Sequence, residues 1–171
     1  STQAKTLFPY TTLFRSMTRT VPVNGKFTPR QRAVYESVLN MMTYAKKILR
    51  PGILKSEYER LVRVFAAGEL VKLGLITPAQ VAEKPSDPPI VRKYYMHGCS
   101  HFLGLDVHDV GETNPVVLPG MVFTIEPGIY IAEEGIGIRL ENDILIGEKE
   151  NIDLLGDVPL LPDDIERLMA R

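Results

Sequence analysis

The sequence of residues 120–146, GMVFTIEPGIYIAEEGIGIRLENDILI, decides the fold class. Its apolar runs are punctuated by glycine and predict two strands, at residues 120–131 and 137–146, joined by a compact connection. Residues 104–110 are also strand-like in their alternation. Strands are therefore expected to dominate the second half of the chain.

Helical spacing of apolar residues dominates the first half of the chain. Thr28 is predicted to cap a helix that has Pro29 at its first position, and Ser56 with Glu59 forms a capping-box pattern. The predicted helices lie at residues 28–49 and 56–73, from Thr77-Pro78 onward, and at residues 162–171. Helices first and strands later predict an α+β fold, with helices packed on a mostly antiparallel sheet.

Composition limits the classes of function. A chain of 171 residues with 44% hydrophobic residues is expected to form one domain with a real core. The net charge of -1 gives no basic field, so no nucleic-acid partner is expected. No apolar run or leader predicts a membrane partner, and the single cysteine, Cys99, is expected to be a buried thiol in a reducing, cytoplasmic location.

Polar side chains concentrate in residues 97–111, 124–130 and 137–143, within otherwise apolar surroundings. The first of these segments holds all three histidines, His97, His101 and His108. Singly, each residue has an ordinary explanation, since two histidines four apart can share a helical face and a strand glutamate can be solvated. Together they favour a site of some kind.

Glu126 and Glu141 each follow apolar residues, so a carboxylate projects from each of two neighbouring apolar strands. Buried carboxylates need a cation or a hydrogen-bond donor. A histidine and two glutamates supply an imidazole and hard oxygens of the kind that Mn, Fe, Co or Zn accepts. The pattern therefore indicates a site for a divalent metal.

These three segments resemble, in order, the metal-site motifs of the aminopeptidase P and prolidase family, within the creatinase and methionine-aminopeptidase group. The resemblance covers residues 17–171 and implies the pita-bread α+β fold. It also implies a site for two divalent metals, typically manganese, with His101, Glu126 and Glu141 as ligands and Glu141 bridging. Two aspartates complete the ligand set in the family.

The resemblance implies hydrolysis of the bond before a proline that stands second in a peptide. Glu126 would act as general base, and His108 would donate a hydrogen bond to the developing oxyanion. His97 would shape the pocket on the proline side, so catalytic or substrate-binding roles fall on His97 and His108. Tyr130 and Arg139 match pocket positions, although Tyr130 also suits packing and Arg139 also suits orientation of a carboxylate.

The N-terminal region departs from the family pattern. Residues 6–16 read TLFPYTTLFRS, which matches a translated sequencing adapter. Residues 1–16 are therefore expected to be a foreign or unstructured segment, the alternative being an ordinary N-terminal strand of unusual composition. Residues 17–171 are expected to be a partial domain, truncated at its N-terminal side. From Met17 onward, residues 18–23 suit a strand and Asn24-Gly25 suits a turn.

No acidic residue precedes Glu36, and Ser16 stands where the nearer family aspartate belongs. We expect the second metal to bind poorly and the chain to be inactive or nearly so. The parent protein is expected to be a homo-oligomeric Xaa-Pro aminopeptidase. The alternatives are an Xaa-Pro dipeptidase, a non-catalytic pita-bread module that binds peptides or partners, and, more weakly, a methionine aminopeptidase.

Overall fold

The computed structural model describes residues 16–104 and 108–170, and the predicted α+β class is confirmed. Most of the predicted foreign segment (residues 1–15), the middle of the predicted strand (residues 105–107) and the end of the last predicted helix (residue 171) lie outside the described residues. The elements in chain order are α1 (Pro29–Ile48), α2 (Lys55–Lys72), α3 (Pro78–Ala82), η2 (Pro89–Lys93), β1 (Val122–Ile125), β2 (Gly128–Ile131), η3 (Ala132–Glu134), β3 (Ile136–Arg139), β4 (Asn142–Leu145), β5 (Ile152–Asp153) and α4 (Pro162–Met169). No helix within the described part of the chain is long and apolar enough to cross a membrane.

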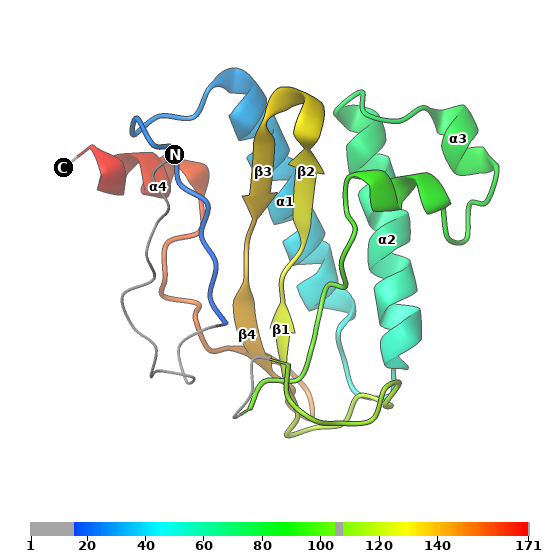
Figure 1. Cartoon of the computed structure of the whole chain (residues 1–171). Coiled ribbons are helices and arrows are strands. Elements are labelled where there is room, and N and C mark those ends of the chain that lie inside the picture. The colour runs from blue at the N-terminus through cyan, green and yellow to red at the C-terminus, as the bar shows by residue number, and fades with distance from the viewer. Residues whose placement is uncertain (1–15, 105–107, 171) are drawn as a thin grey trace.

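The central feature of the fold is a long antiparallel ribbon made by β1 and β2 on one side and β3 and β4 on the other (Figure 1). β1 pairs with β4, and β2 pairs with β3. The β1–β4 and β2–β3 ladders share one pairing register. When this register is extended from either ladder into the gap between them, Glu126 lies directly opposite Glu141. The β5 strand extends the sheet beside β4.

The ribbon is interrupted at the level of these two glutamates. Each of the two predicted strands is present, but each is divided: the first at Glu126 and Pro127, the second at Leu140 and Glu141. Pro127 has no N–H to donate to a ladder, which explains the break on its side. Its carbonyl still accepts from the Leu140 N–H at 3.2 Å, and this contact keeps the two halves in one register.

Side-chain alternation sorts the ribbon into two faces. The core face carries buried apolar residues on both sides of the break, which are Phe123, Ile125, Ile129, Ile131, Ile138, Leu140 and Ile144. The same alternation places the polar side chains on the opposite face, which are Thr124, Glu126, Tyr130, Arg139, Glu141 and Asp143. One face of the ribbon is therefore core, and the other carries the predicted chemistry.

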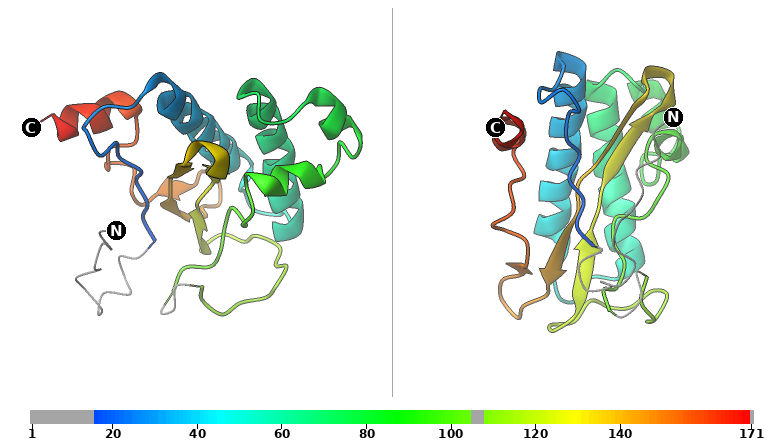
Figure 2. Two further views of the ribbon diagram at one scale, coloured as in Figure 1. Left: turned by 45° about the horizontal axis from the view of Figure 1, so that its top comes forward. Right: turned by 60° about the vertical axis from the view of Figure 1, so that its left-hand side comes forward.

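The helices cover the core face of the ribbon. α1 contacts β1, β2 and β3, and α2 packs beside α1, as the two views of Figure 2 also show. Thr28 caps α1 in a capping box with Gln31, as the Thr28-Pro29 pattern predicts. The α4 helix docks near the start of α1, where Arg32 Nη2 lies 2.6 Å from Asp163 Oδ1.

The predicted capping box at Ser56 and Glu59 is wrong. Residue Leu54 occupies the cap position of α2 without a side-chain hydrogen bond, and the Ser56 N–H donates to Asn114 Oδ1 at 2.7 Å. The Glu59 carboxylate instead accepts from the backbone N–H groups of Cys99 and Ser100, which are distant in the chain.

Two predicted strands are also wrong. Residues 18–23 form only an isolated bridge, between Thr18 and Glu141, although the turn at Asn24-Gly25 is present with Gly25 at a φ of 81°. The described part of residues 104–110 is not a strand. There the Asp109 N–H bonds to the Phe102 carbonyl, so the chain folds back on itself.

Truncating the centre of the core face should destabilise the fold. Ile125 is fully buried, so Ile125→Ala is expected to lower the free energy of unfolding by about 2–5 kcal/mol in a urea titration. Val23→Ala is the matched control, because the Val23 side chain is fully exposed. Equal effects of the two substitutions would contradict this assignment of the core.

Candidate metal centre

The site is built around the two glutamates that face each other across the ribbon. Glu141 is 3% exposed, and the side chain of Glu126 is 15% exposed. Like charges that lie directly opposite on neighbouring strands destabilise a sheet. Burial, followed by repulsion from Glu141, raises the pKa of Glu126 to about 7. A cation between the two carboxylates would remove this repulsion.

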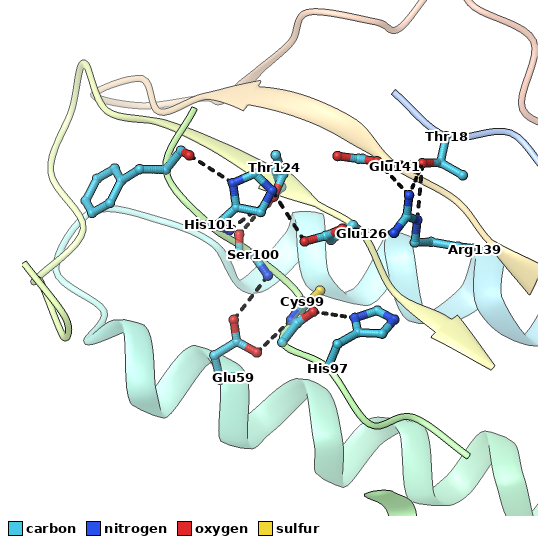
Figure 3. A network of polar contacts seen from close by, with 12 residues as sticks. Thr18, Glu59, His97, Cys99, Ser100, His101, Thr124, Glu126, Arg139 and Glu141 are labelled. Atoms are coloured by element: carbon cyan, nitrogen blue, oxygen red, sulfur yellow. Dashed lines mark hydrogen bonds and ion pairs between the residues drawn. The ribbon is translucent and has the colours of Figure 1, made fainter. Parts of the chain in front are cut away.

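His101 reaches the glutamates from a third segment. Residues 99–103 run antiparallel to β1, since the Glu126 N–H donates to the Cys99 carbonyl at 2.8 Å and the Thr124 N–H to the His101 carbonyl at 3.0 Å. The Nδ1 of His101 lies 2.9 Å from the Phe102 carbonyl oxygen, which can only accept, so Nδ1 carries the proton. In the neutral imidazole, the lone pair of Nε2 then faces Glu126 Oε1, 3.5 Å away (Figure 3).

The residues present fit a metal ion. One ligand atom from each of His101, Glu126 and Glu141 lies within 4.8 Å of the other two. Nitrogen and oxygen ligands at about 2.1 Å from an ion lie about 3–4 Å apart, so small side-chain rotations close this triangle. A neutral imidazole nitrogen held by a backbone carbonyl on its other side is the usual state of a metal-binding histidine.

Thr18 and Arg139 complete the carboxylate side of the site. The Thr18 hydroxyl donates to Glu141 Oε2 at 2.6 Å and accepts from Arg139 Nε and Nη2 at 3.2 and 2.9 Å. Arg139 Nη1 lies 3.8 Å from Glu126 Oε2, and its Nη2 lies 3.8 Å from Glu141 Oε2. The guanidinium therefore offsets part of the negative charge, and the hydroxyl fixes one carboxylate.

His97 and Tyr130 form a second polar pair beside the carboxylates. The His97 Nε2 lies 2.8 Å from the Tyr130 hydroxyl, and its Nδ1 lies 2.8 Å from the Gly98 carbonyl. The carbonyl can only accept, so Nδ1 carries the proton of the neutral imidazole and the tyrosine hydroxyl donates to Nε2. Glycine at positions 128 and 137 lets the tyrosine ring lie close, since a Cβ there would come within 2.7 and 3.3 Å of the Tyr130 side chain.

His108 lies at the exposed mouth of the site. Its ring stacks on that of His101, with the ring centroids 4.4 Å apart and 18° between the ring planes. The two rings border a cavity of about 300 Å³, whose lining residues are His97, Gly98, Ser100, His101, His108, Glu126 and Arg139. The structure therefore brings most of the residues singled out in the sequence around one cavity.

Sequence reasoning missed two residues of this arrangement. Thr18 gave no signal, because its role depends on the bridge to Glu141, which is distant in the chain. Glu59 did give a signal: it shares a helical face with Tyr58, Val62 and Ala66, all of them buried, so a charge stands on the apolar side of α2.

The sequence profile of metallopeptidase family M24 matches residues 8–148. The chain belongs to this family. The Xaa-Pro aminopeptidase of Escherichia coli K12 is 44% identical over 90% of the chain, and that of Haemophilus influenzae is 41% identical, also over 90%. The chain spans 37% and 38% of the length of these two relatives.

Solved structures agree with this M24 assignment and with the predicted pita-bread fold. Zinc-substituted Escherichia coli aminopeptidase P in complex with product superposes with a TM-score of 0.80, at 41% identity over 90% of this chain and 37% of that one. Proline aminopeptidase P II from Yersinia pestis also gives 0.80, at 43% identity over 90% of this chain and 38% of that one.

The carboxylate pair predicts a characteristic pH dependence of the metal-free M24 chain. Its folded state binds more protons than the unfolded state between about pH 4.5 and 7, because the pKa of Glu126 is raised from 4.5 to about 7. The free energy of unfolding should therefore fall as pH rises through this window. Glu126→Gln should flatten the fall and be more stable than the parent at about pH 8, by on the order of 2 kcal/mol.

Urea unfolding in the presence of a chelator measures this dependence. Glu83→Gln, at an exposed position at the end of α3, is the control and should keep the fall. A parent chain whose stability is flat or rises through the window would contradict the raised pKa of Glu126.

Proposed function

We propose that this chain is the metal-binding part of an Xaa-Pro aminopeptidase, which releases the N-terminal residue from peptides with proline second. The observation that carries the proposal is the opposed pair Glu126 and Glu141, with Nε2 of His101 directed at it. The names of the M24 relatives support the substrate class. They favour an aminopeptidase over an Xaa-Pro dipeptidase.

His101, Glu126 and Glu141 would hold one divalent ion, for which we propose Mn²⁺. A bound ion supplies Lewis-acid chemistry, lowering the pKa of water and polarising the scissile carbonyl. The hydroxyl of Thr18 holds Glu141 in place for this role, since it donates to Oε2 at 2.6 Å. In the intact family site two ions are expected.

The chain's own residues would move the protons and bind the peptide. Glu126 borders the cavity and is proposed to accept the proton of the attacking water. His108, at the exposed mouth, would donate a hydrogen bond to the developing oxyanion. His97 and Tyr130, locked together at 2.8 Å, would form the wall on the proline side, and Arg139 would contact the substrate from the carboxylate side.

The described residues form one cluster of three possible ligands. A second ion would need further carboxylate oxygens, which this cluster does not supply. Ser16, the last residue of the adapter-like segment, is 3% exposed and lies two residues before Thr18. The Thr18 side chain faces Glu141, so the chain passes close to the carboxylates at this point. We therefore propose that position 16 is the missing ligand position and that the chain as given has little or no activity.

The location and assembly of the parent protein remain proposals. Cys99 is buried and forms no disulfide, which supports the proposed cytoplasmic location. A homo-oligomeric parent and the foreign origin of residues 1–16 also remain predictions. Resequencing the nucleotides upstream of Met17 tests the latter.

Removing a ligand should weaken metal binding. His101→Ala and Glu141→Gln are each expected to weaken the Mn²⁺ affinity by roughly tenfold or more in calorimetric titrations, because each removes one of the clustered donors. Glu83→Gln, with the same change of charge at an exposed position, should bind Mn²⁺ like the parent. Unchanged affinity in the two ligand variants would contradict the proposed centre.

Restoring an acid at position 16 should strengthen the site. Ser16→Asp is expected to raise the Mn²⁺ affinity by roughly tenfold and the number of ions bound, and to raise cleavage of a tripeptide with proline second. Ser16→Asn is the matched control, with the same shape and no charge. Equal behaviour of the two variants would contradict the assignment of Ser16. A dipeptide with proline second separates aminopeptidase from dipeptidase activity.

A further inference from the structure

Glu59 is a nearly buried carboxylate on α2 whose contacts the proposed chemistry does not explain. It is 9% exposed, and it accepts from the backbone N–H of Cys99 at 2.8 Å and of Ser100 at 3.1 Å. Lys55, one turn earlier on the same helix, lies 3.0 Å from its Oε1. The charge is therefore balanced, and each carboxylate oxygen has a defined partner.

The two N–H groups belong to the segment that delivers His101. One edge of residues 99–103 already pairs with β1, through the carbonyls of Cys99 and His101. The N–H groups of Cys99 and Ser100 are left over from this pairing. Buried backbone donors need acceptors, and Glu59 supplies both from the side of the segment away from β1. The segment is thus held between a strand and a helix (Figure 3).

Side-chain contacts also hold residues 99–101 against β1. The Cys99 side chain is fully buried, and the Tyr58 hydroxyl, next to Glu59 on α2, donates to its sulfur at 3.4 Å. The Ser100 hydroxyl donates to the Thr124 carbonyl on β1, and the Thr124 hydroxyl accepts from the His101 N–H at 3.1 Å. Among these contacts, Glu59 contributes the charged group, and it accepts hydrogen bonds from two successive backbone N–H groups.

We propose that Glu59 is a positioning residue that fixes residues 99–101 against β1 and thereby places the His101 imidazole next to Glu126. The metal-binding consequence rests on the proposed function. The positioning itself concerns the metal-free chain and stands on the contacts above. Glu59 acts through the backbone of Cys99 and Ser100 and does not line the cavity.

An amide should not replace this carboxylate. In Glu59→Gln one oxygen can still accept from a backbone N–H, but the –NH2 group meets the other N–H donor to donor. One hydrogen bond is lost, and a buried donor is left unpaired. Glu69→Gln is the matched control, because Glu69 is also a buried glutamate of α2, 2% exposed, and its partners Lys72 and Asn40 lie outside the site.

The test compares these two variants with the parent chain in two measurements. Amide hydrogen exchange at Cys99 and Ser100 is followed by NMR without metal, and each rate is compared with the rate of exchange through global unfolding of the same variant. In Glu59→Gln, exchange at these two amides should be roughly tenfold faster or more. In Glu69→Gln it should be unchanged. Titration with Mn²⁺ alone should show roughly tenfold weaker affinity or more for Glu59→Gln, the loss typical of groups that orient a metal ligand. Glu69→Gln should bind like the parent.

Other outcomes overturn the proposal. Parent-like exchange at both amides in Glu59→Gln, or the same local change in Glu69→Gln, contradicts positioning by Glu59. If Glu59→Gln fails to fold, Glu59→Asp decides, because it keeps the charge but retracts the carboxylate by about 1.5 Å. It should then show faster exchange at the two amides, and parent-like protection contradicts the proposal. A parent chain that binds no Mn²⁺ contradicts the proposed function, whereas the exchange measurement still decides the role of Glu59.

Discussion

The opposition of Glu126 and Glu141 across one antiparallel register is the constraint on which the rest of the site depends. Two carboxylates in a largely buried, directly opposite pair repel each other, and burial followed by this repulsion raises the pKa of Glu126. A fold that keeps such a pair needs a compensating positive charge. Arg139 offsets part of it at 3.8 Å from each carboxylate, and the His101 nitrogen leaves room for an ion to supply the rest.

The elements around the pair fix its geometry. Pro127 interrupts the ladder where the glutamates stand, while the core residues on either side keep the two halves in register. The Thr18 hydroxyl donates a hydrogen bond to the Glu141 carboxylate. The His101 imidazole belongs to a segment that lies between β1 and α2. The helices therefore do more than cover the core: through Glu59, α2 also reaches the strand-like segment that carries the histidine.

Sequence patterns predicted the helices, the two long strands and the grouping of His101, Glu126 and Glu141, because these depend on local periodicity and on residue type. The interruption of each strand was not predicted. Pro127 does mark the break in the first strand, whereas apolar alternation continues through Leu140 and Glu141 and gives no signal in the second. The capping box at Ser56 and Glu59 was wrong for a tertiary reason: backbone donors distant in the chain bind the carboxylate. Thr18 could not be assigned, because only the folded chain brings it to Glu141.

The central claim is that a divalent ion binds between the opposed glutamates and His101. Anomalous X-ray scattering from crystals of the chain grown with Mn²⁺ tests it most directly, since the peak locates the ion independently of activity. The account predicts a peak within about 2.0–2.3 Å of His101 Nε2 and of an oxygen of each of Glu126 and Glu141. Crystals with the three side chains ordered and no manganese peak among them would contradict it.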